Sequence, residues 1–226
     1  MMDMNIWFIL IAVMVLSFIV QAVLKSKFSK YSKVPLRSGL TGAQVAARML
    51  QENGITDVKV TCIKGTLTDH YNPVNKTVNL SEDVYYGMSV ASAAVAAHEC
   101  GHVVQHAVGY APLKMRSALV PVVSFSNNIV QWILLLGVLL IKLTPALLYL
   151  GIAMFAFSTL FSLVTLPVEI NASSRAVRWL EASHLVDGET RPQAADALKW
   201  AAYTYVIAAI GSIATLLYYL GMAQRR

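Results

Sequence analysis

The sequence predicts an α-helical integral membrane protein with four transmembrane helices and a small cytoplasmic α+β domain. Three observations predict this class. Hydrophobic residues make up 57% of the 226 residues and charged residues only 13%, about half the charged share of an average soluble domain. Four stretches are apolar enough to cross a bilayer, and the positive charges gather on one side of them. The same composition excludes a soluble, disordered or collagen-like chain.

The four apolar stretches differ in length. A spanning helix needs about 20 mostly apolar residues, and three runs supply them: Ile6 to Leu24, Ala146 to Val168, and Tyr203 to Leu220. The second run in chain order, Ile129 to Leu143, is shorter. It reaches full length only if its helix begins near Val120, which brings in polar side chains that would lie near an interface or face other protein.

The distribution of charge predicts the topology. No positive side chain precedes the first run, and several lysines follow it, so we expect a retained anchor with its N-terminus outside rather than a cleaved signal peptide. Of the 18 Lys and Arg residues, 15 fall in the segments 25–117 and 169–202, which are then cytoplasmic; the other three are Lys142, Arg225 and Arg226. The net charge of +6 is therefore read as membrane topology, and no nucleic-acid partner is expected.

The chain is expected to divide into five segments. An N-terminal transmembrane anchor covers 1–28, and a cytoplasmic segment covers 29–117. A transmembrane hairpin follows at 118–168, then a second cytoplasmic segment at 169–202, and a C-terminal transmembrane helix at 203–226. The lipid bilayer is the first partner that this organisation implies.

Helical patterns account for most of the two cytoplasmic segments. Thr41 is a candidate N-cap for a helix that Gly54 ends, and Ser89 begins a long alanine-rich helix that Gly109 ends. The segment 169–202 continues the third span as a helix, turns, and begins another helix.

Strand patterns lie between the two helices of the larger segment. Residues 58–63 alternate in the manner of a strand, and the runs 66–71 and 76–80 flank a turn, which predicts a β-hairpin. The two cysteines, Cys62 and Cys100, are too few for a disulfide framework and are expected as free thiols.

The long helix carries an H-E-x-x-H motif, from His98 to His102. The two histidines are about 40° apart around a helix and roughly 6 Å apart along it, so both imidazoles can reach one zinc ion. Glu99 lies on the adjoining edge, where it can take a proton from a zinc-bound water. Surface polar residues are the alternative, but the five residues before the motif, 93–97, are small or apolar. Cys100 lies about 200° from His98 and is read as a packing residue.

A catalytic zinc needs a third protein ligand and an open fourth position. His106 continues the histidine series, but it lies about 12 Å from His98 along a straight helix and cannot join it. Glu169 follows Pro167 at the cytoplasmic end of the third span, where the transmembrane hairpin has returned the chain to the side of the motif. A carboxylate so close to a membrane is costly unless it is paired or bound to a metal. We therefore favour Glu169 as the third ligand; an ion pair with Arg175 is the alternative.

Metal-assisted hydrolysis of an amide also needs a donor for the oxyanion. The candidates are His70, Tyr71 and His184, each of which has the alternative of a plain surface position. The hairpin is expected to present an edge strand that could pair with an extended substrate. Glycine inside a helix costs about 1 kcal/mol relative to alanine, so Gly101 is expected where another backbone approaches closely, and the hairpin is the candidate.

Several segments around the motif resemble the YugP-type neutral zinc metallopeptidases, a family of bacterial membrane proteins, and the resemblance covers nearly the whole chain. The segments are His98–His106, Asp69–Pro73, Leu80–Ser81 and Pro167–Ala176. More distantly, Glu169-x-x-Ala172 is similar to the downstream glutamate motif of the HtpX and CAAX prenyl protease group of gluzincins. An Asp often follows that Ala there, whereas this chain has Ser173.

The resemblance implies a gluzincin-like catalytic domain built on the H-E-x-x-H helix and the hairpin. It implies His98, His102 and Glu169 as ligands of one Zn²⁺ per chain, and Glu99 as the catalytic base. It further implies a bacterial membrane protein. Together with the charge distribution, this makes the leading hypothesis a multi-pass protein of the bacterial inner membrane that acts, at the cytoplasmic face, on membrane proteins or peptides.

Two other classes of function compete with a peptidase. One is a non-catalytic zinc-stabilised scaffold that binds or regulates membrane partners, but a purely structural site has no need of Glu99. The other is a channel or transporter that uses His98 and His102 as a metal pathway. The position of the motif outside the predicted spans argues against it.

Overall fold

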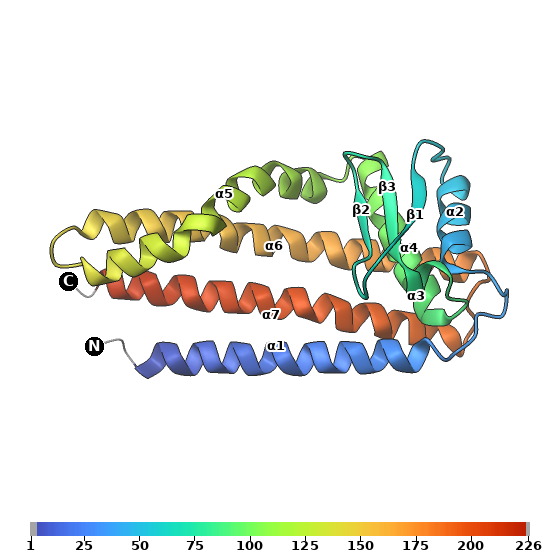
Figure 1. The fold of residues 1–226 in the computed structure, drawn as a ribbon, viewed down its shortest axis with the longest axis horizontal. Helices are drawn as coiled ribbons and strands as arrows, with labels where there is room; N and C mark the ends of the chain where they lie inside the picture. Colours follow the sequence, from blue (N-terminus) through green and yellow to red (C-terminus); the bar gives the residue numbers. More distant parts are fainter. Residues whose placement is uncertain (1–3, 225–226) are drawn as a thin grey trace. The chain divides into compact units, whose positions relative to one another are not determined.

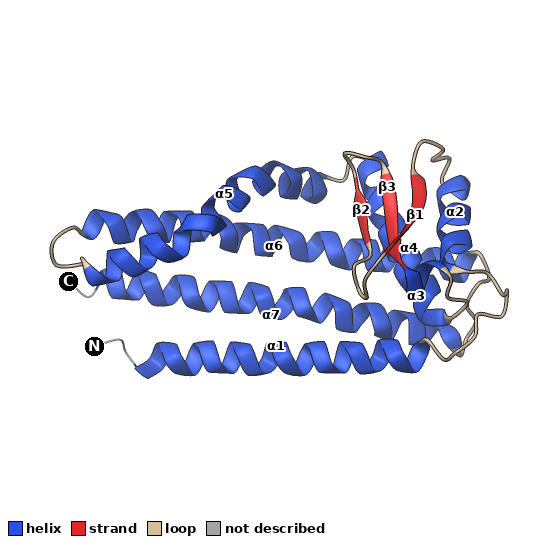
Figure 2. Ribbon diagram, in the orientation of Figure 1, coloured by secondary structure: helices blue, strands red, loops and turns tan. Residues whose placement is uncertain are grey.

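The structure, a computed structural model, describes residues 4–224. Arg225 and Arg226, which entered the count of outer charges, lie outside the described residues. The described chain is mostly helical with one small sheet (Figures 1 and 2). Its elements, in order, are α1 (Met4–Tyr31), α2 (Gly42–Glu52), β1 (Lys59–Ile63), β2 (His70–Asn72), β3 (Thr77–Ser81), α3 (Glu82–Tyr85), α4 (Val90–Ala107), α5 (Ala111–Leu139), α6 (Pro145–Ala182) and α7 (Thr190–Gln224).

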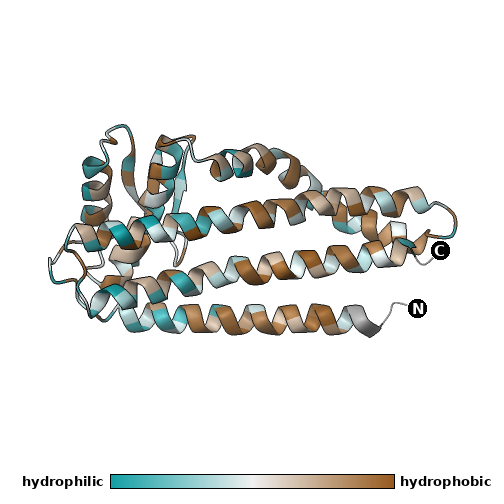
Figure 3. Cartoon of the chain, turned by 180° about the vertical axis from the view of Figure 1, so that it is seen from behind, coloured by the Kyte–Doolittle hydropathy of each residue, from teal (hydrophilic) through white to brown (hydrophobic). Residues whose placement is uncertain are grey.

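Four of the helices, α1, α5, α6 and α7, are long and apolar enough to cross a membrane. The expectation of four spans and a small sheet is confirmed at this level. α6 joins the third apolar run to the helix expected after it, and α7 joins the helix expected at the end of the segment 169–202 to the fourth run. Figure 3 shows how the hydropathy changes along these two helices. The C-terminal end of α6 and the N-terminal end of α7 are hydrophilic, and the rest of each helix is mostly hydrophobic.

α5 begins earlier than the sequence suggests. The expected start near Val120 is wrong, because the helix already begins at Ala111 and contains Pro121. Its first turns carry Lys114 and Arg116, and charged residues such as these are not part of an apolar run.

The chain forms two compact units. The apolar unit consists of residues 4–19, 111–167 and 204–224, and the sheet unit of residues 20–110 and 168–203. In the apolar unit, a Cβ on Gly137 of α5 would lie 2.7 Å from the Cα of Leu148 on α6. This approach of two backbones is typical of helices packed in a membrane, where small residues replace the hydrophobic effect as the reason for close contact.

The sheet has the order β1-β3-β2. The expected hairpin is present as the antiparallel pair β2–β3, with Tyr71 opposite Val78. Its first strand is shorter than expected, because Gly65 and Leu67 have positive φ angles of 113° and 58° and turn the chain away from an extended form. β1 pairs in parallel with β3, with Val60 opposite Val78, a pairing that local sequence patterns do not reveal.

The two longer helices of the segment 29–117, α2 and α4, begin and end where their capping residues predict. Thr41 and Gln44 form a capping box at the start of α2, and Gly54 follows its end with φ +69°. Ser89 caps α4, and Gly109 follows it with φ +65°. α4 packs against α2 and against one face of the sheet (Figure 1), so its central residues are buried.

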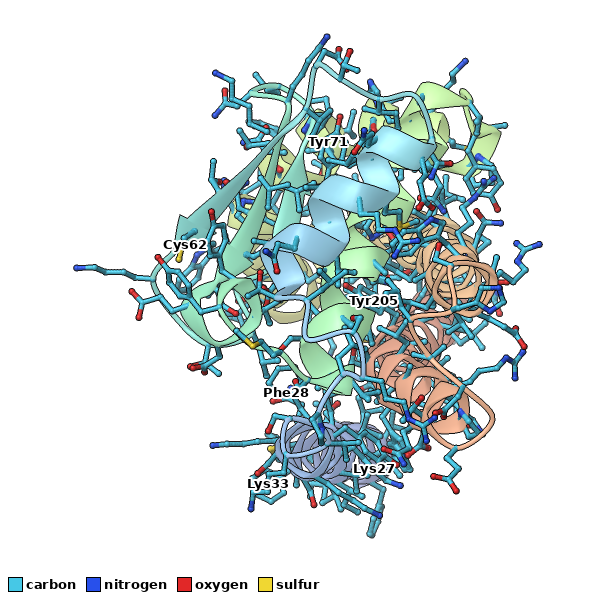
Figure 4. All side chains as sticks on the ribbon, turned by 90° about the vertical axis from the view of Figure 1, so that its right-hand side faces the viewer. Lys27, Phe28, Lys33, Cys62, Tyr71 and Tyr205 are labelled. Atoms are coloured by element: carbon cyan, nitrogen blue, oxygen red, sulfur yellow. The ribbon has the colours of Figure 1, made fainter. Side chains whose placement is uncertain are left out.

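Both cysteines are free thiols, as expected. Cys62 lies exposed on the edge strand β1 (Figure 4). Cys100 is completely buried, and its thiol lies 3.6 Å from the carbonyl oxygen of Ala46 on α2. Burial raises the pKa of the Cys100 thiol far above its ordinary value, which fits a residue that packs the core.

Candidate metal centre

Three side chains of the H-E-x-x-H motif lie together on α4. His98 and His102 are four residues apart, so their imidazoles project from the same side of the helix. Glu99 and His102 are 7% and 8% exposed, although they are polar. Burial of such groups is costly unless they have partners.

The partner comes from α6, 67 residues beyond His102. The Glu169 carboxylate is 3% exposed, and its Oε2 lies 3.3 Å from Nε2 of His98 and 3.4 Å from Nε2 of His102. The three possible ligand atoms all lie within 4.8 Å of one another. The structure therefore brings together the three residues that the sequence pointed to as ligands.

These separations suit a tetrahedral zinc ion. Zinc binds imidazole nitrogen and carboxylate oxygen at about 2.0–2.2 Å, and donors at tetrahedral angles around it are about 3.3–3.6 Å apart. The two imidazole–carboxylate separations have this length. With zinc bound, two neutral imidazoles and one carboxylate would leave the fourth position for water or substrate, as in catalytic sites. The residues present thus fit the metal.

A glycine on α4 sets the position of Glu169. A Cβ on Gly101 would lie 2.7 Å from the carbonyl oxygen of Ala172 on α6. The close approach expected at Gly101 is therefore real, but the neighbour is α6 and not the hairpin. Ala172 lies one turn after Glu169, so the contact holds the carboxylate against the two histidines.

Each imidazole has a hydrogen-bonding partner on its outer nitrogen. Nδ1 of His98 lies 3.1 Å from the hydroxyl of Ser173, and Nδ1 of His102 lies 3.0 Å from Oε1 of Gln105. Such partners orient metal-binding imidazoles.

Burial lowers the pKa of His102, but its contact with the Glu169 carboxylate more than offsets this, and the pKa lies above its ordinary value.

Comparison with known proteins identifies the family. Residues 6–224 match the sequence model of a family described as "Putative neutral zinc metallopeptidase". The chain belongs to this family. It is also 45% identical over 210 residues to a Bacillus subtilis (strain 168) protein named "Putative membrane protease YugP", a match that covers 93% of this chain and 92% of that one. No solved structure matches the chain.

Membership of this zinc metallopeptidase family makes zinc the metal that the site of His98, His102 and Glu169 is expected to hold. The family resemblance drawn from the sequence is thereby confirmed. The roles of individual residues rest on the geometry described above.

The three candidate oxyanion donors are placed differently. Both ring nitrogens of His70 have partners within the sheet region: Nδ1 lies 2.8 Å from the carbonyl oxygen of Thr68, and Nε2 lies 3.1 Å from Nδ2 of Asn79. Tyr71 is half-buried, and its ring meets the ring of His106 edge-on, with centroids 6.1 Å apart. Burial raises the pKa of Tyr71, so the phenol keeps its proton at neutral pH and can donate it.

His184 is not brought to the cluster. It is exposed and lies beyond the end of α6, with φ +55°. Ala182, the last residue of α6, is 13 residues past Glu169, which corresponds to about 20 Å of helix. His106, already set aside as a ligand, lies one turn past His102, where it contacts Tyr71.

Two residues of the site were not found from the sequence. Gln105 lies three residues after His102, on the same helix face, which was a usable signal. Asn171 contacts Gln105 across 66 residues, and nothing local indicates this. Arg175, considered above as an ion-pair partner for Glu169, donates through Nε to Oδ1 of Asn171 at 2.8 Å.

Proposed function

We propose that the chain is a membrane-embedded zinc metalloendopeptidase that hydrolyses peptide bonds of membrane-associated proteins or peptides at the cytoplasmic face. One observation carries the proposal: two imidazoles and one largely buried carboxylate have their ligand atoms within 4.8 Å of one another, and Glu99 stands beside them on the same helix. The family and the YugP relative support it.

In this proposal His98, His102 and Glu169 hold one zinc ion, which supplies a polarised carbonyl and a water of lowered pKa when it is bound. Glu99 is 100° around the helix from His98 and about 60° from His102, so its carboxylate faces the side of the site next to the ligands. Glu99 takes the proton of the attacking water and passes it to the leaving amine. The arrangement is that of a gluzincin-like catalytic domain.

The substrate backbone is positioned by two further features. β2 is an edge strand in the order β1-β3-β2, and an extended peptide can add to such an edge through main-chain hydrogen bonds. Tyr71, on this strand and against α4, is the best placed of the three candidates to donate to the oxyanion. His70 is engaged within the sheet region, and His184 lies too far along α6.

The topology in this proposal is that of a multi-pass protein of the bacterial inner membrane with its sheet unit in the cytoplasm. The five-segment division, with the anchor at 1–28 and the hairpin at 118–168, remains part of it. Lysines at the end of α1 support the orientation.

Within the sheet unit, Lys27 of α1 pairs with Asp196 of α7 at 2.7 Å, and Tyr31 donates to the same carboxylate at 2.6 Å.

The test is the Glu99→Gln variant. We expect it to bind one zinc per chain like the wild type and to lose cleavage of a bacterial membrane-protein digest, monitored by mass spectrometry of new peptide termini. Glutamine keeps the size of the side chain but cannot accept the proton. Cys100→Ala, the neighbouring buried residue that faces α2, serves as the control and should cleave. No cleavage by the zinc-loaded wild type would favour the non-catalytic scaffold, and equal cleavage by Glu99→Gln and wild type would show that Glu99 is not the base.

A further inference from the structure

Gln105 is completely buried one turn beyond His102. Each hydrogen-bonding group of its side-chain amide is engaged. Oε1 lies 3.0 Å from Nδ1 of His102, and Nε2 donates to the carbonyl oxygen of Val168 at 2.8 Å and to Oδ1 of Asn171 at 3.0 Å. A polar side chain with no exposure and full satisfaction is held in one orientation.

The acceptors on α6 decide which way the amide faces. The Val168 carbonyl can only accept, so it requires the NH₂ end of Gln105. Asn171 could in principle present either end of its own amide, but Arg175 donates to it at 2.8 Å. A guanidinium is a donor only, so Asn171 must direct its oxygen toward both neighbours. Two acceptors on α6 therefore bind the two N–H groups of Gln105, and its oxygen is left to face His102.

We infer that Gln105 is a positioning residue that holds His102 in the Nδ1–H tautomer and thereby leaves the Nε2 lone pair free for the metal. The inference rests on the proposed metal site and deepens it. Oε1 of Gln105 can only accept, so Nδ1 of His102 must carry the proton. Nε2, which faces Glu169 at 3.4 Å, is then the nitrogen that can bind zinc.

His98 provides an internal contrast. Its Nδ1 faces the hydroxyl of Ser173 at 3.1 Å, and a hydroxyl both donates and accepts. Ser173 therefore orients the ring of His98 without choosing its tautomer. The two histidines on α4 differ in this respect. Only His102 has its tautomer fixed by a protein partner before a metal binds.

The tautomer can be measured without zinc. In the full-length Glu169→Ala protein in detergent, no carboxylate at position 169 draws a proton to Nε2. At pH 9, ¹⁵N NMR of labelled histidine, assigned through loss of the signals in His102→Gln, should show His102 protonated at Nδ1. Adding Gln105→Met should shift His102 to the Nε2–H form that free imidazole side chains favour. Nε2–H in the Glu169→Ala protein that retains Gln105 would overturn the inference.

Zinc affinity, measured by competition with a chelator in the protein with Glu169 intact, gives the second readout. Loss of a partner to a ligand imidazole costs about 10–100-fold in metal affinity, and we expect this for Gln105→Met. Gln105→Glu still offers an acceptor to His102, so it should stay within about threefold of wild type, although its lost donations to Val168 and Asn171 lower the melting temperature. Cys100→Ala, buried on the opposite face of α4, is the control with wild-type affinity.

The outcomes separate this inference from the proposed function. If both Gln105 variants lose zinc in proportion to their melting temperatures, or if Gln105→Met binds zinc like wild type, Gln105 has a structural role only and the inference fails. If wild type binds no zinc, the proposed function fails, while the NMR result still decides the tautomer.

Discussion

Gly101 of α4 and Ala172 of α6 lie so close that a Cβ on the glycine would be 2.7 Å from the alanine's carbonyl oxygen. This contact joins the helix that carries the two histidines to the helix that carries Glu169, 67 residues away in the chain. It explains why a glycine stands in the middle of a buried helix, where alanine would otherwise be about 1 kcal/mol better.

Replacement of this glycine should separate the two helices. We expect Gly101→Ala to lower the free energy of unfolding by about 1–3 kcal/mol, the usual cost of overpacking, and to weaken zinc binding because Glu169 moves away from the imidazoles. Chelator competition and thermal unfolding measure the two effects. Gly221→Ala is the matched control: a Cβ there, also in a helix, meets nothing within 4 Å, so it should be neutral or slightly stabilising. Equal behaviour of the two variants would show that the contact does not position Glu169.

The hydroxyl of Ser173 should matter for zinc affinity. Ser173→Ala removes the partner of Nδ1 of His98, and we expect a loss of about tenfold, at the low end of the range for such partners. Ser173→Asp should bind zinc at least as well as the wild type, because a carboxylate is a stronger acceptor. Ser174→Ala, its exposed neighbour on α6, controls for general effects on the helix. An unchanged zinc affinity in Ser173→Ala would show that the Ser173 hydroxyl does not support zinc binding.

The partly buried carboxylate of Asp69, in the sheet unit, should make the free energy of unfolding depend on pH. Burial raises the pKa of Asp69, although the amide and hydroxyl of Ser81 donate to it at 2.7 and 3.0 Å. A folded pKa above the unfolded value means that its contribution to stability is complete below the unfolded pKa of about 3.9 and is lost as pH rises through the folded pKa. The stability of wild type minus that of Asp69→Asn should therefore fall as pH rises from about 4 to 7. Chemical unfolding of both proteins measures this difference, and a constant or rising difference would contradict the assignment.

The sequence predicted those parts of the fold that depend on local patterns. Apolar runs gave the spans, and caps such as Thr41 and Ser89 gave the helix ends. The parallel pairing of β1 with β3 joins strands that another strand separates in the chain, and no local pattern indicates it. The early start of α5 was missed because its first turns carry charge, which a hydropathy window excludes.

The candidate site, too, was predicted from the sequence only in part. The spacing of His98 and His102 on one helix is sufficient to predict that they meet, and the returning hairpin indicated Glu169. The outer contacts, Ser173 with His98 and Gln105 with Asn171, depend on which faces of α4 and α6 meet. That choice is made by Gly101 and the packing around it, so these contacts could be found only in three dimensions.

The most direct test of the account is the metal content of the detergent-purified protein, with wild type measured beside Glu169→Ala. The measurement needs no substrate. We expect one zinc per chain in wild type and a zinc content in Glu169→Ala that falls to near zero after dialysis against a weak chelator. Zinc retained by Glu169→Ala, or absent from freshly prepared wild type, would contradict the three-ligand site on which the proposed peptidase depends.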